Sequence, residues 1–91
     1  MAARLVRITG RVQGVGYRDW MLGEARRLGL SGWVRNRRDG SVEALLDGDE
    51  PSIGQMLTAC RAGPPAARVD AIEEDFAQPP DHPGFIRLPT A

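Results

Sequence analysis

Apolar and polar residues alternate along the start of the chain. In residues 4–12, RLVRITGRV, the side chains of Val6, Ile8 and Val12 fall on one side and those of Arg7, Thr9 and Arg11 on the other. This period of two is typical of a half-buried β-strand. From residue 17 the apolar spacing changes to three and four, which predicts one face of a helix that ends at a glycine: Tyr17, Trp20, Met21, Ala25, Leu28 and then Gly29.

The remaining chain predicts further elements in the same way. The segment SGWVRNR, residues 31–37, is a short strand, and a turn at RRDG leads into SVEALL, whose alternating apolar residues make it the hairpin partner. A second amphipathic helix begins after the cap residue Asp49 and stops at GPP, residues 63–65. The segment 67–76 is strand-like, and FIRLP at 85–89 is a candidate for an extra strand.

The predicted order βαββαβ is the split βαβ pattern. We therefore expect one α+β domain over residues 1–91, with a ferredoxin-like fold in which two helices pack on one face of an antiparallel sheet. In the usual strand order 4-1-3-2, strands one and two are parallel, with strand three between them. Their C-terminal ends then share one edge of the sheet, which places Asn36 roughly 10 Å from the loop that follows the first strand.

Composition and charge narrow the possible partners. The chain has 12 basic and 12 acidic residues, so it lacks the net positive field of most nucleic-acid modules. No apolar run approaches the roughly 18 residues that a membrane helix needs, and the N-terminus lacks a signal-peptide core. The single cysteine, Cys60, lies on the apolar face of the second helix and is expected to be a buried thiol. These features favour a cytoplasmic protein that binds neither nucleic acid nor membrane.

The stretch RVQGVGYR, residues 11–18, is the candidate for chemistry. Gly14 and Gly16 allow consecutive backbone amides to turn toward one point, and the helix that follows offers its free amide groups to an anion. Arg18 adds a planar charged fork that suits two phosphoryl oxygens. The competing interpretation is a plain turn between a strand and a helix. The stretch lacks the lysine and hydroxyl of a nucleoside-triphosphate loop.

Three separated motifs carry a resemblance to a known family. GRVQGVGYR at 10–18, GLSGWVRNRRDGSVEALLDG at 29–48 and GPPAARVD at 63–70 occur in the same order and with similar spacing in acylphosphatases. The chain resembles this family from about Arg4 to Leu88. The resemblance implies the ferredoxin-like fold and an enzyme that hydrolyses acyl phosphates to a carboxylate and inorganic phosphate. We expect the protein to be a monomer.

The resemblance also implies roles for particular residues. It implies that Arg18 binds the phosphoryl group and that Asn36 orients the attacking water. The phosphate-binding loop would comprise Val12, Gln13, Gly14, Val15, Gly16, Tyr17 and Arg18. The sequence departs from the family at Asp19, where many members have a neutral or basic residue, and at Met21, where several have threonine. We expect Asp19 either to repel the substrate or to compete for the Arg18 guanidinium.

The chemistry is consistent with this set of residues. A carboxylate leaving group, whose conjugate acid has a pKa near ~4, needs no protonation by the enzyme at neutral pH. The loop has neither histidine nor cysteine, and the chain has no clustered carboxylates with metal-ligand spacing, which predicts catalysis without metal or cofactor. His82, in a proline-rich segment, is expected to lie in a solvated loop. The alternative is a non-catalytic module that binds acyl phosphate, carbamoyl phosphate or another small anion.

Overall fold

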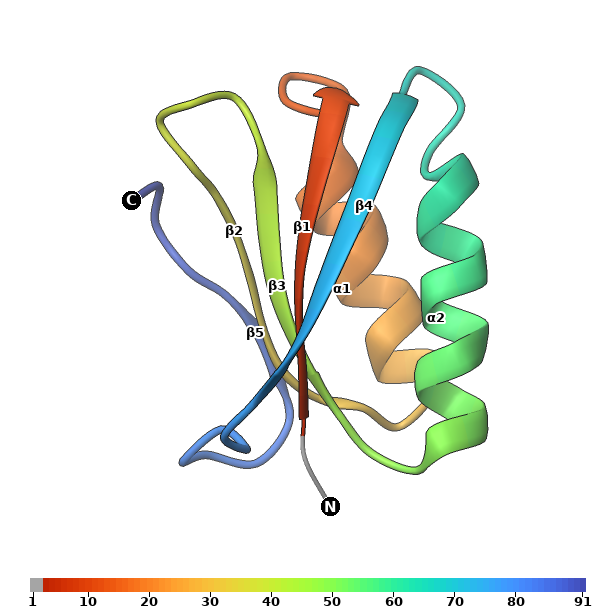
Figure 1. Ribbon diagram of the computed structural model, residues 1–91, viewed down its shortest axis with the longest axis vertical. Coiled ribbons are helices and arrows are strands. Elements are labelled where there is room, and N and C mark those ends of the chain that lie inside the picture. The colour runs from red at the N-terminus through yellow and green to blue at the C-terminus, as the bar shows by residue number, and fades with distance from the viewer. Residues whose placement is uncertain (1–2) are drawn as a thin grey trace.

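The computed structural model describes residues 3–91 and consists of one sheet with two helices on the same face (Figure 1). The strands form a single five-stranded sheet in the order β4-β1-β3-β2-β5. No helix in residues 3–91 is long and apolar enough to cross a membrane. In chain order the elements are β1 (Ala3–Arg11), α1 (Tyr17–Arg27), β2 (Ser31–Asn36), β3 (Val42–Asp47), α2 (Glu50–Ala62), β4 (Arg68–Ala77) and β5 (Phe85–Arg87).

The first four strands have the predicted order and directions. Strand β1 pairs antiparallel with β3 and β4, and β2 pairs antiparallel with β3. Because β1 and β2 both run against β3, they are parallel to each other and end at the same edge of the sheet. This edge carries the loop between β1 and α1 and the end of β2 at Asn36.

The candidate extra strand exists, and it makes the sheet mixed where a fully antiparallel sheet was expected. Strand β5 pairs parallel with β2, with Gly32 opposite Phe85 and Val34 opposite Arg87. Strand β4 runs opposite to β1 and β2, so it ends where β2 begins. The chain crosses there from one edge of the sheet to the other, and β5 therefore runs in the same direction as β2 (Figure 1). Beyond β5 the pairing continues, because Ala91 donates its backbone amide to the Asn36 carbonyl at 3.0 Å.

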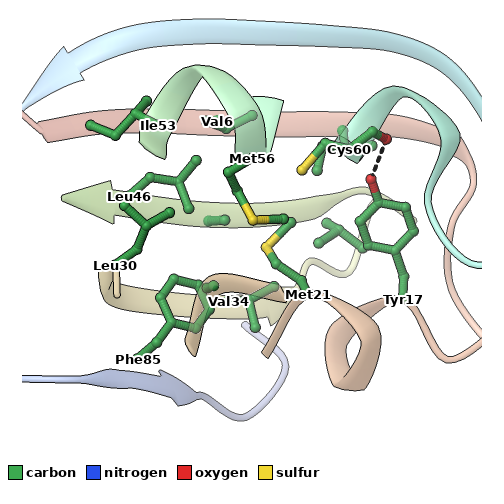
Figure 2. Packing of buried hydrophobic residues seen from close by; sticks show 14 of the residues in the cluster. Val6, Tyr17, Met21, Leu30, Val34, Leu46, Ile53, Met56, Cys60 and Phe85 are labelled. Atoms are coloured by element: carbon green, nitrogen blue, oxygen red, sulfur yellow. Dashed lines mark hydrogen bonds between the residues drawn. The ribbon is translucent and has the colours of Figure 1, made fainter. Parts of the chain in front are cut away.

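The core lies between the sheet and the helices, and most of its members lie on the faces that the apolar spacing predicts, although Trp20 and Leu28 are only partly buried. Val6 and Ile8 from β1, and Ile53 and Cys60 from α2, are almost fully buried. Figure 2 shows Met21 of α1 and Met56 of α2 pointing toward each other in the middle of this cluster. Further members are Val12, Tyr17, Ala25, Leu30, Val34, Val42, Ala44, Leu46 and Phe85.

The helix ends show which local signals the chain uses. Helix α1 ends where Gly29 adopts a left-handed φ of 73°, and the amides of Gly29 and Leu30 bond to the Arg26 and Ala25 carbonyls. This pairing satisfies carbonyls that a helix end leaves free. Helix α2 follows Asp49 as predicted, but the Asp49 side chain makes no capping hydrogen bond. Pro51, which has no amide to satisfy, occupies the first turn instead.

Candidate active site

The loop after β1 and the end of β2 enclose a cavity of about 90 Å³ at the shared sheet edge. The topology therefore brings together the two segments that sequence analysis placed opposite each other. Space of this size accommodates a phosphoryl group and a water molecule. The lining residues are Val12, Gln13, Gly14, Gly16, Tyr17, Arg18, Asp19, Asn36 and Arg87.

Two glycines give the loop its shape. Gly14 and Gly16 have φ values of 72° and 79°, in the left-handed region that residues with a Cβ seldom adopt. A Cβ at either position would have no neighbour within 4 Å, so the backbone conformation requires glycine and the available space does not. Gly16 is the N-cap of α1, and no side chain caps this helix start. The amides of the first turn therefore remain available to an anion.

The side chains of three loop residues make structural contacts, of which sequence analysis anticipated only the place of Tyr17 on the apolar face of α1. The Gln13 amide nitrogen donates to the carbonyls of Arg37 and Ser41 at 2.7 and 2.9 Å, which ties the loop to the β2–β3 turn. Val15 packs against the core and does not line the cavity. Tyr17 is buried, and its hydroxyl donates a hydrogen bond to the Cys60 backbone carbonyl at 2.5 Å (Figure 2). These residues can offer backbone amides to a ligand while their side chains hold the loop in place.

Arg18 is positioned to bind a ligand, because its charge is not used elsewhere. It occupies the second position of α1 and lines the cavity, and its guanidinium forms no hydrogen bond or ion pair with any residue in the range 3–91. The expected competition from Asp19 does not occur. Asp19 instead pairs with Arg87 of β5, because the extra strand brings that arginine to the cavity.

Asn36 lines the same cavity, and one of its side-chain atoms has no hydrogen-bond partner among residues 3–91. It is the last residue of β2, and its backbone carbonyl is held by Ala91 as described above. Its side-chain oxygen, Oδ1, is buried and has no hydrogen-bond partner among residues 3–91. A buried acceptor without a protein partner is costly, so this oxygen is one that a bound water or ligand would satisfy. The Asn36 amide is therefore suited to holding a water molecule beside a group bound to Arg18.

The remaining candidates for nucleophile, base or metal ligand do not converge on the cavity. Burial raises the pKa of the Cys60 thiol to about 12, so the thiol stays protonated at neutral pH. Burial also raises the pKa of the Tyr17 hydroxyl. No group of three or more histidine, cysteine or acidic side chains able to hold a metal occurs within the described 3–91 range. His82 is exposed, and its ring nitrogen lies 3.2 Å from the carbonyl of Pro83.

Comparison with known proteins supplies the family. The family model described as Acylphosphatase matches residues 4–86. An acylphosphatase from Acidiphilium cryptum is 57% identical over 90 residues, and one from Rhodospirillum rubrum is 54% identical over 90 residues; each alignment covers 99% of both chains.

Solved structures give the same result. The crystal structure of acylphosphatase from Bacillus subtilis superposes with a TM-score of 0.91 at 35% identity, covering 97% of this chain and 99% of that chain. Full-length HypF in its phosphate- and nucleotide-bound form matches with a TM-score of 0.89 at 25% identity, but the match covers only 12% of that chain.

Proposed function

Because the chain belongs to the acylphosphatase family and hydrolyses acyl phosphates, we propose that it does so through water held by Asn36 and a phosphoryl group bound by Arg18. The observation that carries this proposal is the buried, unpartnered Oδ1 of Asn36, a residue that lines the same cavity as Arg18. The backbone of residues 12–18 contributes further donors to the phosphoryl oxygens. In this proposal Asn36 orients the water and Arg18 binds the phosphoryl group.

The reaction makes few demands on the protein. The water oxygen forms a bond to phosphorus, the bond between phosphorus and the acyl oxygen breaks, and its electron pair leaves with the carboxylate. The water proton passes to a phosphoryl oxygen, since the second pKa of a phosphate lies near ~6. Because the carboxylate leaves without protonation, no general acid is needed. Positioning and charge stabilisation then supply the catalysis.

The cavity's donor set supports catalysis without a metal or cofactor. Among residues 3–91, Asp19 is the only carboxylate that lines the cavity, and it is paired with Arg87. A magnesium site normally draws on carboxylates together with substrate phosphate. We therefore propose that Arg18 and the loop amides provide the positive charge that a metal would supply in other phosphoryl-transfer enzymes.

The same proposal extends to the setting of the reaction. Residues 1–91 act as a single domain and as a monomer in the cytoplasm, with an acyl phosphate as substrate, inorganic phosphate as product, and no nucleic-acid or membrane partner. The zero formal net charge supports the absence of a polyanion partner. The free, buried thiol of Cys60 suits a reducing compartment.

An activity assay with the purified protein in EDTA tests the mechanism. We expect hydrolysis of benzoyl phosphate, followed by ultraviolet absorbance, to survive chelation. An alkyl phosphate such as ethyl phosphate should react at the background rate, because no residue is placed to protonate an alkoxide leaving group. Loss of activity in EDTA with recovery in magnesium, or similar rates on both substrates, would contradict the mechanism. Phosphate binding without turnover would indicate the small-anion binding module.

A further inference from the structure

The rim of the cavity carries a second cation that the mechanism does not use. Arg87 lines the cavity from β5, on the opposite side of β2 from the strand that leads into the loop. Its guanidinium pairs with Asp19 on α1, and the two side chains are 44% and 71% exposed. The ion pair therefore lies at the mouth of the cavity, where solvent reaches both partners.

The size of the cavity determines which part of the substrate lies near Arg87. A volume of about 90 Å³ suffices for the phosphoryl group and its water but cannot enclose an acyl chain as well. The acyl group must therefore leave the cavity across its rim. At the rim it passes residues that belong neither to the loop nor to Asn36, and Arg87 is the cationic one among them.

Asp19 keeps Arg87 at this outer position. Without an acidic partner, a flexible arginine beside the cavity would turn toward the phosphoryl oxygens, as Arg18 is free to do. The ion pair with Asp19 holds the guanidinium at the rim. An exposed ion pair contributes little stability, because solvent screens it, so a substrate carboxylate can share the guanidinium at little cost. The planar fork of Arg87 offers donors to two acceptors at once.

We propose that Arg87 is a specificity-determining residue that favours acyl phosphates whose acyl group carries a free carboxylate, a second one beside the carboxyl group that is bonded to phosphate. This inference rests on the proposed function, because it takes the phosphoryl group to be bound by Arg18 and the loop. The second carboxylate binds the outward edge of the Arg87 guanidinium while Asp19 holds the other edge. A substrate without that carboxylate leaves Arg87 paired with Asp19 alone.

The test compares substrates that differ only at the far end of the acyl group. Benzoyl phosphate is compared with its 3-carboxy and 4-carboxy derivatives. The rigid ring prevents the added carboxylate from attacking the acyl phosphate, and the two ring positions place that carboxylate at two different distances from the phosphoryl group. The readout is the kcat/KM of each carboxylated substrate divided by that of benzoyl phosphate. We expect Arg87→Gln to lower this ratio about fivefold for at least one derivative, the scale of a solvent-exposed charge pair. Arg87→Lys should restore most of the ratio, because it keeps the charge.

Two further measurements test whether the effect is local to Arg87 and whether it is electrostatic. Arg38→Gln removes an exposed arginine outside the cavity and should leave the ratio unchanged. In the unmodified protein the ratio should fall as ionic strength rises from about 0.01 to 1 M, because the Debye length shrinks from about 30 to 3 Å. An unchanged ratio in Arg87→Gln, or an equal fall in Arg38→Gln, would overturn the inference. Failure of the unmodified protein to hydrolyse benzoyl phosphate would instead overturn the proposed function.

Discussion

Two side chains at the cavity contribute different kinds of interaction. The Arg18 guanidinium carries a charge that no residue in the described part of the chain neutralises, so it attracts the phosphoryl group before and during the reaction. Asn36 is neutral, and its buried Oδ1 can hold water without adding much to the binding of an anion. Substitutions at these two positions should therefore have separable kinetic effects.

We expect Arg18→Lys to weaken competitive inhibition by phosphate and to lower turnover together, because an ammonium cannot reproduce the two-pronged contact. Asn36→Ala should lower kcat by roughly 10² to 10³, the scale for losing one preorganised polar group, with little change in the phosphate inhibition constant. Steady-state kinetics on benzoyl phosphate with phosphate as inhibitor measure both effects.

Arg38→Lys, a change of the same type at an exposed position outside the cavity, is the matched control for Arg18→Lys. Circular dichroism establishes that each variant is folded. Equal loss of phosphate affinity in the Arg18 and Asn36 variants would make Asn36 a phosphate ligand. Normal turnover in either variant would remove that residue from the mechanism.

Among the elements, β2 and β3 approach each other unusually closely near the start of β2, at the end of the strand opposite Asn36. Gly32 of β2 lies opposite Leu46 of β3 and has a φ of 135°. A Cβ there would lie 1.8 Å from the Leu45 carbonyl oxygen, far inside any allowed contact. The position therefore requires glycine both for its conformation and for the approach of the two strands.

Gly32→Ala should lower the free energy of unfolding by about 2 to 4 kcal/mol, since the strands must separate and the residue is strained. Gly23 in α1 is the matched control, because it is exposed and a Cβ there meets no atom within 4 Å. Gly23→Ala should raise the free energy of unfolding by about 0.5 to 1 kcal/mol. Urea unfolding followed by tryptophan fluorescence gives both values. An equal effect of the two changes would show that the close strand contact has no special cost.

At the scale of the whole molecule, buried groups that lose a proton couple global stability to alkaline pH. Tyr17 and Cys60 join the two helices through one hydrogen bond, and burial raises the pKa of both side chains. The thiol titrates at about 12 in the folded protein, against an ordinary value of 9.0. In the unfolded chain both groups lose their protons at lower pH than in the folded protein. The unfolded state therefore binds fewer protons above pH 9, and stability falls as pH rises.

We expect the free energy of unfolding to be nearly independent of these groups below pH 9. Above pH 9 it should fall by up to about 1.4 kcal/mol per pH unit for each group that is ionised only when unfolded. Urea denaturation at a series of pH values measures the slope. Cys60→Ala should make the slope shallower from pH 9 upward, and Tyr17→Phe should do so from pH 10 upward. A slope that is the same in both variants as in the unmodified protein would assign the alkaline loss of stability to other groups.

The spacing of apolar residues and the turn residues are enough to predict most of the helices and strands, because both reflect local conformational preferences. The alternation in residues 4–12 and the spacing around Met21 and Met56 predict which faces are buried, and the buried residues confirm them. The known strand order of the split βαβ pattern then places Asn36 at the same sheet edge as the loop. The motif resemblance identified the family, and the family model and relatives confirm it.

Patterns that are local in the chain are therefore enough to predict the elements, the buried faces, the glycine loop and the family. The folded arrangement was needed to find that Gln13 ties the loop to the β2–β3 turn, that Asn36 Oδ1 has no partner within residues 3–91, and that Asp19 pairs with Arg87. The physical reason is the range of the interactions. A helix or strand face follows from residues two to four apart, whereas Asp19 and Arg87 lie 68 positions apart and meet only because β5 adds to β2 in a parallel register.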